Sequence, residues 1–351
     1  MVYKSCGHLI YNCMWFSGDL SKEDKPLMLT FCCRDESRNI GVLLCENPAE
    51  TYANYIARKN EIINEAIRVK QTGEDSENDY FNACSRCDYF FEAESTDYDH
   101  VEGIHIITYG IDPAPCQAKC IYCWSEDNQR RPYNKETDDP GYELLFKHIE
   151  YFREQKLFSD SMHWDFGAGE ISIHPFRERL FDAVGTDHGR WLTNCFIFSE
   201  RIAENLKANP LSCVLFSMDA GTAKTWHKVK GVDNFSKVKE NLLKYIHAAQ
   251  NPSEQVHLKY IILPGINDDI KNFNAFIQFA LANNIKVITL SRDATKACTD
   301  ADIERASLLA SFIFKNGLNP GFDIFTPEEM EKIVEMAATN FARYHPDYKI
   351  Q

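Results

Sequence analysis

The sequence is short of positive charge. The chain has 351 residues, with 38 Lys and Arg against 52 Asp and Glu, and its formal net charge is −14. Nucleic acids and anionic membranes are bound chiefly through clustered Lys and Arg side chains. We therefore expect neither a nucleic acid nor a membrane to be the main partner of this protein.

Long apolar runs are also lacking. The nearest to one is 307–314, far short of the roughly 20 residues that cross a bilayer. Residues 1–16 contain no uninterrupted apolar stretch of the kind that precedes the cleavage site of a signal peptide. These absences predict a cytoplasmic protein. In a reducing compartment, disulfides are the weaker interpretation of its cysteines.

Cysteine, by contrast, is abundant, with thirteen residues in the chain. Ten of them lie before residue 124, and only Cys195, Cys213 and Cys298 are scattered over the rest. Thiolates are the ligands of zinc and of iron–sulfur clusters, so this concentration predicts metal binding. The three scattered cysteines fit better as small buried apolar side chains.

From residue 104 on, short β-branched runs alternate with helical patterns, which is typical of repeated βα units around a parallel sheet. We expect strands at 104–109, 162–166, 191–196, 213–218, 256–262 and 286–290. We expect helices at 142–155, 174–184, 200–209, 235–247 and 269–283, then at 303–315 and 327–344, the last capped by Thr326. Six strands are too few for a closed eight-stranded barrel, so the sequence predicts an α/β fold with an open sheet or an incomplete barrel.

One motif follows the first of these strands. Cys116, Cys120 and Cys123 are spaced C-x3-C-x2-C, with no fourth Cys or His beside them. A structural zinc site normally has four protein ligands and is closed. Three thiols therefore predict a site with one open coordination position, at which a further molecule binds.

This spacing resembles the signature of the radical S-adenosylmethionine (radical SAM) enzymes. The stretches that follow later strands are similar to that superfamily too: Gly167-Ala168-Gly169-Glu170, Thr193-Asn194-Cys195, Ser217-Met218-Asp219-Ala220-Gly221-Thr222, 230–235 and 260–267. The resemblance covers roughly residues 100–295. It implies an incomplete (β/α)6 TIM-type barrel over 99–300, followed by a helical extension over 301–351.

In that superfamily three thiolates hold a 4Fe-4S cluster, and S-adenosylmethionine binds the open iron. Reductive cleavage of the cofactor then yields a 5′-deoxyadenosyl radical, which abstracts a substrate hydrogen. An external donor such as flavodoxin or ferredoxin supplies the electron. The resemblance assigns the cluster to Cys116, Cys120 and Cys123, and it assigns contacts with the cofactor to Tyr122, Gly169, Glu170, Asn194 and Ser217. The alternative roles of these five residues are ordinary packing, a tight turn or hydrogen bonding to the backbone.

The first 98 residues resemble the auxiliary iron–sulfur domain called SPASM or, when shortened, twitch. The implied ligands of a second cluster are Cys13, Cys32, Cys84 and Cys87, with Cys33 able to replace Cys32. This domain usually follows the barrel, whereas here it precedes it. Zinc is the alternative, because four thiolates are equally competent to bind it.

The resemblance names a reaction class without a substrate. We expect modification of a peptide or protein by oxidation, epimerisation or cross-linking, with a sugar or another small metabolite as the alternative substrate. Cys195 is the candidate hydrogen donor, or else simply a buried side chain. Lys228 and Lys230 could reach a carboxylate or form a charged helix face. A non-catalytic iron–sulfur carrier or sensor is the competing class, and a zinc hydrolase is disfavoured because no H-E-x-x-H motif is present.

Overall fold

The computed structural model describes residues 1–20, 22–23, 25–32, 40–87, 90, 93–96, 100–123, 133–167 and 169–344. Cys33 and Ala168, which belong to the predicted motifs, lie outside the described residues. The chain divides into two compact units. Unit 1 comprises Met1–Pro115, Arg131–Gly169 and Glu178–His188, and unit 2 comprises Cys116–Arg130, Glu170–Arg177 and Gly189–Gln351.

Unit 1 is built on a sheet that is partly parallel. Strands β2 (Cys13–Asp19), β6 (Ile104–Asp112) and β7 (Phe158–Phe166) pair in parallel, with β6 between the other two. Strand β3 (Met28–Thr30) pairs antiparallel with β2, and β4 (Val42–Leu43) pairs antiparallel with β3. The N-terminal segment therefore contributes a parallel neighbour to the first strand of the predicted barrel.

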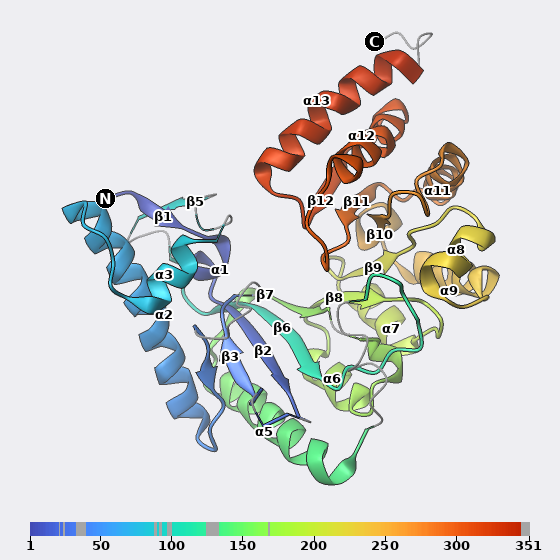
Figure 1. Cartoon of the computed structure of the whole chain (residues 1–351). Helices are drawn as coiled ribbons and strands as arrows, with labels where there is room; N and C mark the ends of the chain where they lie inside the picture. The colour runs from blue at the N-terminus through green and yellow to red at the C-terminus, as the bar shows by residue number, and fades with distance from the viewer. Residues whose placement is uncertain are drawn as a thin grey trace. The chain divides into compact units, whose positions relative to one another are not determined.

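The helices of unit 1 begin and end where the sequence supplies caps. The longest, α2 (Pro48–Thr72), begins with a proline in its first turn after Asn47, whose side chain accepts a hydrogen bond from Ala49 N. It ends at Gly73, which has a left-handed conformation, and it packs against β3 and β4 (Figure 1). The remaining elements of unit 1 are α1 (Gly7–Ile10), α3 (Asp79–Ser85), α5 (Lys135–Glu154), α6 (Arg177–Val184) and an antiparallel pair, β1 (Tyr3–Ser5) with β5 (Ala93–Ser95).

Unit 2 contains a parallel sheet. Its strands are, in order across the sheet, β8 (His188–Thr193), β9 (Cys213–Ser217), β10 (Val256–Ile262), β11 (Val287–Arg292) and β12 (Pro320–Asp323). The central strands bury one face completely, because Val214, Phe216, Leu258 and Tyr260 alternate along β9 and β10, share a face and are fully buried. The residues between them, such as Leu215 and Lys259, are partly exposed. The carboxyl ends of these strands meet at one edge, which is where ligands bind in folds of this kind.

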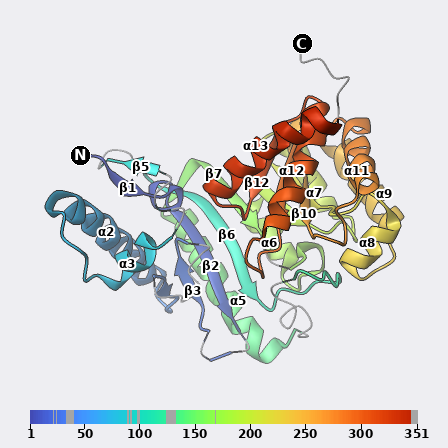
Figure 2. The same ribbon diagram turned by 45° about the horizontal axis from the view of Figure 1, so that its top comes forward.

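Helices connect these strands. They are α7 (Glu200–Ala208), α8 (Ala223–Lys230), α9 (Phe235–Ala248), α10 (Pro252–Gln255), α11 (Ile270–Ala282), α12 (Asp300–Lys315) and α13 (Pro327–Tyr344). A short 3-10 turn, η2 (Ile171–Ile173), precedes α6. Helices α12 and α13 lie side by side (Figures 1 and 2). The predicted cap of α13 is present, because Thr326 Oγ1 accepts from Glu329 N and the Glu329 carboxylate accepts from Thr326 N.

The α/β class with parallel strands is confirmed, and all six predicted strands are present. Strands β2 and β12 were not predicted from the sequence. β2 pairs in parallel with β6, and β12 pairs in parallel with β11. Among the described residues neither unit closes into a barrel. The predicted domain boundaries at 98/99 and 300/301 stay predictions. No helix within the described ranges is long and apolar enough to span a membrane.

Candidate functional site

The three-cysteine loop is held on the carboxyl-terminal end of α8. Lys119 N donates to the Lys230 carbonyl at 2.9 Å, and Ile121 N donates to the Val229 carbonyl at 3.1 Å. Gly231 permits this approach. Its φ is +69°, and a Cβ at this position would lie 2.8 Å from the Lys119 Cβ, so another residue would meet both backbone strain and a clash. The end of α8 thus fixes the loop by backbone contacts.

Each of the first two thiols has a polar neighbour. The Asn194 amide Nδ2 lies 3.4 Å from Cys116 Sγ, and Cys120 lies within the electrostatic influence of Lys230 and the Tyr122 hydroxyl. Burial raises the pKa of the Cys116 thiol to about 11 and also raises the pKa of Cys120. Among the described residues, no three His, Cys, Asp or Glu side chains are gathered closely enough to hold a metal ion.

The chemistry of these donors fits an iron–sulfur cluster. Three thiols on one loop are the ligand type that such clusters use, and thiolates also bind zinc. Hydrogen-bonding groups next to ligand sulfurs are a usual second layer of metal sites, because they orient the ligands and stabilise their charge. Asn194 and Tyr122 stand in that position next to Cys116 and Cys120.

A buried ion pair lies beside Cys120. Lys230 Nζ and Asp219 Oδ2 are 2.5 Å apart, and their side chains are only 2% and 0% exposed. The Tyr122 hydroxyl donates to the same carboxylate oxygen and accepts from Lys230 Nζ, both at 2.5 Å. The Tyr122 ring packs against a buried apolar cluster that includes Val229. The predicted contact between Tyr122 and adenine stays a prediction.

Asp219 also joins neighbouring strands. It follows the end of β9 with φ at +48°, its Oδ1 accepts from Ile261 N at 2.6 Å, and its carbonyl accepts from Asn267 Nδ2 at 2.9 Å. The sequence analysis named Lys230 as a side chain that could reach a carboxylate, and it does so at Asp219, which was not itself predicted as a site residue. The charged helix face was correct for Lys228, which is exposed, and wrong for Lys230, which is buried.

Glu170 is buried and accepts hydrogen bonds from several donors. Its carboxylate accepts from Thr193 Oγ1 at 3.1 Å, from Asn194 N at 2.7 Å, and from both N and Oγ of Ser172 at 3.1 and 2.7 Å. Burial raises its pKa, and these hydrogen bonds oppose the shift. Glu170 therefore holds Asn194 in place next to Cys116. Its predicted contact with the amino group of S-adenosylmethionine stays a prediction.

Cys195 occupies a strained position. Its side chain is fully buried, its φ is +57°, and its N donates to Thr193 Oγ1 at 3.0 Å. A left-handed conformation favours glycine, which is the residue of many superfamily members here. Burial raises the pKa of the Cys195 thiol well above its usual value. Its role as a hydrogen donor stays a prediction, as does a cofactor contact for Ser217, which is half-buried at the end of β9.

Gly169 also has a backbone conformation that favours glycine. Its φ is +62°, and a Cβ here would lie 2.5 Å from the Ala114 carbonyl oxygen. The residue type at this position is therefore set by local geometry. A contact between Gly169 and the cofactor stays a prediction.

The predicted ligands of the second cluster lie on separate elements of unit 1. Cys13 begins β2 and is 2% exposed, Cys32 follows β3, Cys84 lies in α3 at 8% exposure, and Cys87 comes two residues after the end of α3. The Tyr55 hydroxyl donates to the Cys13 carbonyl at 2.7 Å. These four thiols, and the choice between Cys32 and the undescribed Cys33, stay predictions.

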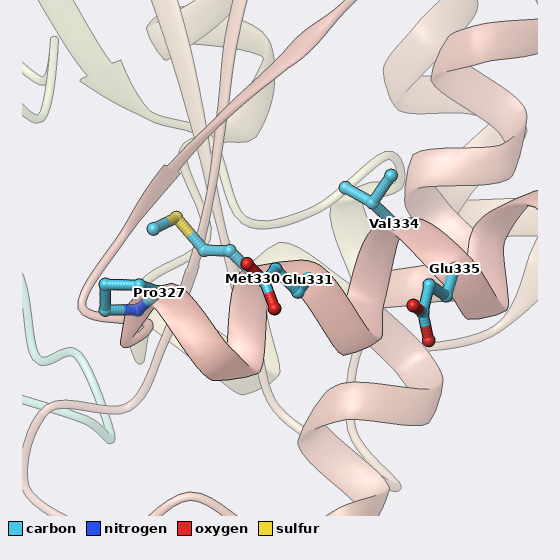
Figure 3. Close-up of a pocket in the computed structure, with 5 residues that line it drawn as sticks. All are labelled: Pro327, Met330, Glu331, Val334 and Glu335. Carbon is cyan, nitrogen blue, oxygen red and sulfur yellow. The ribbon is translucent and has the colours of Figure 1, made fainter.

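A surface hollow lies along α13. It is lined by Pro327, Met330, Glu331, Val334 and Glu335, whose side chains are shown in Figure 3. None of these residues was a predicted site residue. The hollow is apolar at Met330 and Val334 and is bordered by carboxylates.

No known sequence family and no curated protein matches the chain. Several solved structures are similar to it. SuiB of Streptococcus suis bound to the precursor peptide SuiA is 11% identical, with a TM-score of 0.49 over 95% of this chain and 75% of that one. SuiB bound to S-adenosylmethionine is 13% identical, with a TM-score of 0.48 over 93% and 75%.

A radical SAM methyltransferase from Sphaerobacter thermophilus is 12% identical, with a TM-score of 0.44 over 60% of this chain and 63% of that one. These descriptions agree with the radical SAM resemblance seen in the motifs. Their TM-scores are below 0.5 and their identities are below 25%. The activity and the substrate proposed for this chain therefore rest on its own residues.

Proposed function

We propose that the protein is a radical SAM enzyme that cleaves S-adenosylmethionine at a 4Fe-4S cluster held by Cys116, Cys120 and Cys123. The observation that carries this proposal is the three-thiol loop, because polar groups from three other segments support it. Asn194 follows β8, Asp219 follows β9 and Lys230 ends α8. When bound, the cluster supplies one electron for reductive cleavage of the cofactor.

The chain's own residues have defined tasks in this proposal. The backbone of α8 holds the loop in place through Lys119 and Ile121. Glu170 orients Asn194, whose amide then donates toward Cys116. Packing of the loop against α8 and the buried polar groups limits water around the thiols, which strengthens the electrostatic interactions there.

The test is an anaerobic assay of the reconstituted protein with S-adenosylmethionine and dithionite, in which 5′-deoxyadenosine is measured. We expect its formation by the wild type and none above background by C116A/C120A/C123A. C298S is the matched control, because it removes a thiol outside the motif, and it should retain cleavage. A wild type that binds iron at the motif without producing 5′-deoxyadenosine would contradict the proposal and favour an electron carrier or sensor.

For the substrate we propose a peptide or protein, modified by oxidation, epimerisation or cross-linking. The net charge of −14 supports a basic peptide, because opposite charge favours encounter. The same assay with candidate peptides, followed by mass spectrometry, tests this. Mass changes on sugars or small metabolites alone would replace the peptide with the alternative substrate class.

The remaining parts of the proposal concern the electron donor, the second cluster and the location in the cell. A flavodoxin or ferredoxin would supply electrons in place of dithionite, and Cys13, Cys32, Cys84 and Cys87 would hold the second cluster. We propose a cytoplasmic location, since a reducing compartment keeps thiols available as ligands.

A further inference from the structure

The buried ion pair beside the three-cysteine loop has no role in the function proposed so far. Lys230 and Asp219 are almost completely buried, and taking two charges out of water costs several kcal/mol for each ion before their attraction is counted. Such a pair is therefore weak evidence for stability alone. Its location next to Cys120 suggests an electrostatic task.

We propose that Lys230 is a positioning residue that raises the reduction potential of the cluster held by Cys116, Cys120 and Cys123. This inference rests on the proposed function, because it concerns the same cluster. Reduction adds one negative charge to the cluster, and a nearby buried cation stabilises the more negative state. The potentials of iron–sulfur clusters respond to net charge, hydrogen bonds to sulfur and solvent exposure.

Lys230 lies at the loop, because its carbonyl accepts from Lys119 N and its ammonium donates to the Tyr122 hydroxyl. Lys230 acts more strongly on Cys120 than Asp219 does, and the two effects oppose each other. Asp219 instead points toward β10, where its other carboxylate oxygen accepts from Ile261 N. Because both charges are buried, their effects on the thiols are screened less than those of surface charges.

The ammonium of Lys230 has a fixed place. It lies 5.0 Å from the centre of the Tyr122 ring and 5.5 Å from that of Trp226, in addition to its contacts with Asp219 and the Tyr122 hydroxyl. Two aromatic faces and a carboxylate stabilise the charged form. The pKa of Lys230 is accordingly raised by Asp219 despite its burial, so its positive charge persists.

The test is a potentiometric titration of the reconstituted protein followed by electron paramagnetic resonance. The signal of this cluster is the one that disappears in C116A/C120A/C123A. Removing Lys230 alone would leave Asp219 buried and unpaired, which is strongly destabilising. Removing Asp219 alone would likewise leave the Lys230 ammonium buried and unpaired. The informative comparison is therefore the wild type against D219N/K230M, since neither protein contains an unpaired buried charge.

We expect D219N/K230M to have a lower potential than the wild type, because it loses the ammonium beside the loop together with a carboxylate that also accepts hydrogen bonds from Ile261 N and Tyr122. The difference between the two proteins should be at least tenfold in the ratio of reduced to oxidised cluster, about 59 mV for a one-electron couple. K228M is the matched control, because it removes an exposed charge from the same helix. It should match the wild type.

Equal potentials for the wild type and D219N/K230M would overturn the inference and leave the proposed function intact. If the double variant does not fold, D219N/K230Q makes the same comparison with a polar side chain at the same position. A wild type without any cluster signal at the motif would instead overturn the proposed function, together with this inference.

Discussion

The two groups of cysteines in this protein differ in how the chain brings them together. Cys116, Cys120 and Cys123 lie within one loop, whereas Cys13, Cys32 and Cys84 come from three separate elements of unit 1. A loop motif keeps its thiols close along the chain, although the described residues do not gather three of them into a metal-binding arrangement. The dispersed set depends on how β2, β3 and α3 pack.

The surroundings of the two groups differ as well. The loop has an amide, a phenol and an ammonium beside its thiols, supplied by Asn194, Tyr122 and Lys230. In unit 1 the Tyr55 hydroxyl donates to the backbone carbonyl of Cys13 and so fixes the start of β2. The comparison teaches that the loop site is supported by side chains from beyond its own motif.

The largest effect should come from removing each group in turn. C116A/C120A/C123A should abolish formation of 5′-deoxyadenosine while retaining the iron of a second cluster. C13A/C32A/C84A/C87A should lose the iron of the second cluster. It should still cleave S-adenosylmethionine, because the loop site consists of other residues. Iron analysis with Mössbauer spectroscopy, alongside the cleavage assay, measures both.

Each arm of this experiment can fail separately. If C116A/C120A/C123A holds no residual cluster iron, the second cluster does not exist and the two groups of cysteines are not comparable sites. Zinc in place of iron in that variant would make the N-terminal group a structural zinc site. Circular dichroism of both variants shows whether the fold has survived the substitutions.

A smaller effect should follow from disturbing the support of the loop. G231A introduces a Cβ 2.8 Å from the Lys119 Cβ at a residue whose φ is +69°. Backbone strain costs about 1 kcal/mol, and the clash adds about 2 kcal/mol. Chemical denaturation should show a loss of about 3 kcal/mol, and the iron content of the loop site should fall.

The matched control is G317A. Gly317 also lies in unit 2, and its φ of +70° is nearly the same, but a Cβ added at this position would have no atom of the described residues within 4 Å. The free energy of unfolding of G317A should fall by only about 1 kcal/mol, the cost of backbone strain. Its iron content should not change. If the two variants lose equal stability, the close approach of Lys119 to Gly231 is not what supports the loop.

The smallest effect concerns acid. His174 is 2% exposed, and burial lowers its pKa to about 3, from 6.5 in the unfolded chain. Neutral His174 therefore contributes stability that is fully present above pH 6.5 and is lost as the pH falls toward 3. Relative to H174Q, the wild type should lose about 1.4 kcal/mol per pH unit between pH 6 and 4.

Urea denaturation of the two proteins across this pH range measures the difference. H247Q is the matched control, because it removes an exposed imidazole from α9 in the same unit. If the difference in free energy of unfolding between wild type and H174Q stays constant over this pH range, the buried imidazole is not a source of acid sensitivity in unit 2.

Much of the fold was predictable because the βα pattern is local. Strand β10 and helix α13 were predicted at their observed bounds, and the cap of α13 at Thr326 was read directly from the sequence. Strands β2 and β12 were missed. β12 has only four residues, and β2 pairs in parallel with β6, which lies about 90 residues further along the chain, so neither strand has a strong local signal.

The candidate site divides in the same way. The spacing of the three thiols in the loop and the glycine-like position of Cys195 are properties of consecutive residues, and sequence reasoning found both. The burial of Lys230 follows from helical position, because Lys230 lies four residues after the buried Trp226 and shares its face, whereas Lys228 lies on the opposite face and is exposed. Only the tertiary structure shows that its partner in this buried position is Asp219.

The sequence by itself determined the class of chemistry, since three thiols on a short loop can act together wherever the loop lies. Only the tertiary structure decided the electrostatics of the site. Asp219, Tyr122 and Lys230 meet because β9, the loop and α8 converge, and their charges act strongly because burial excludes water. The convergence of distant segments is a property of the fold, which no local pattern encodes.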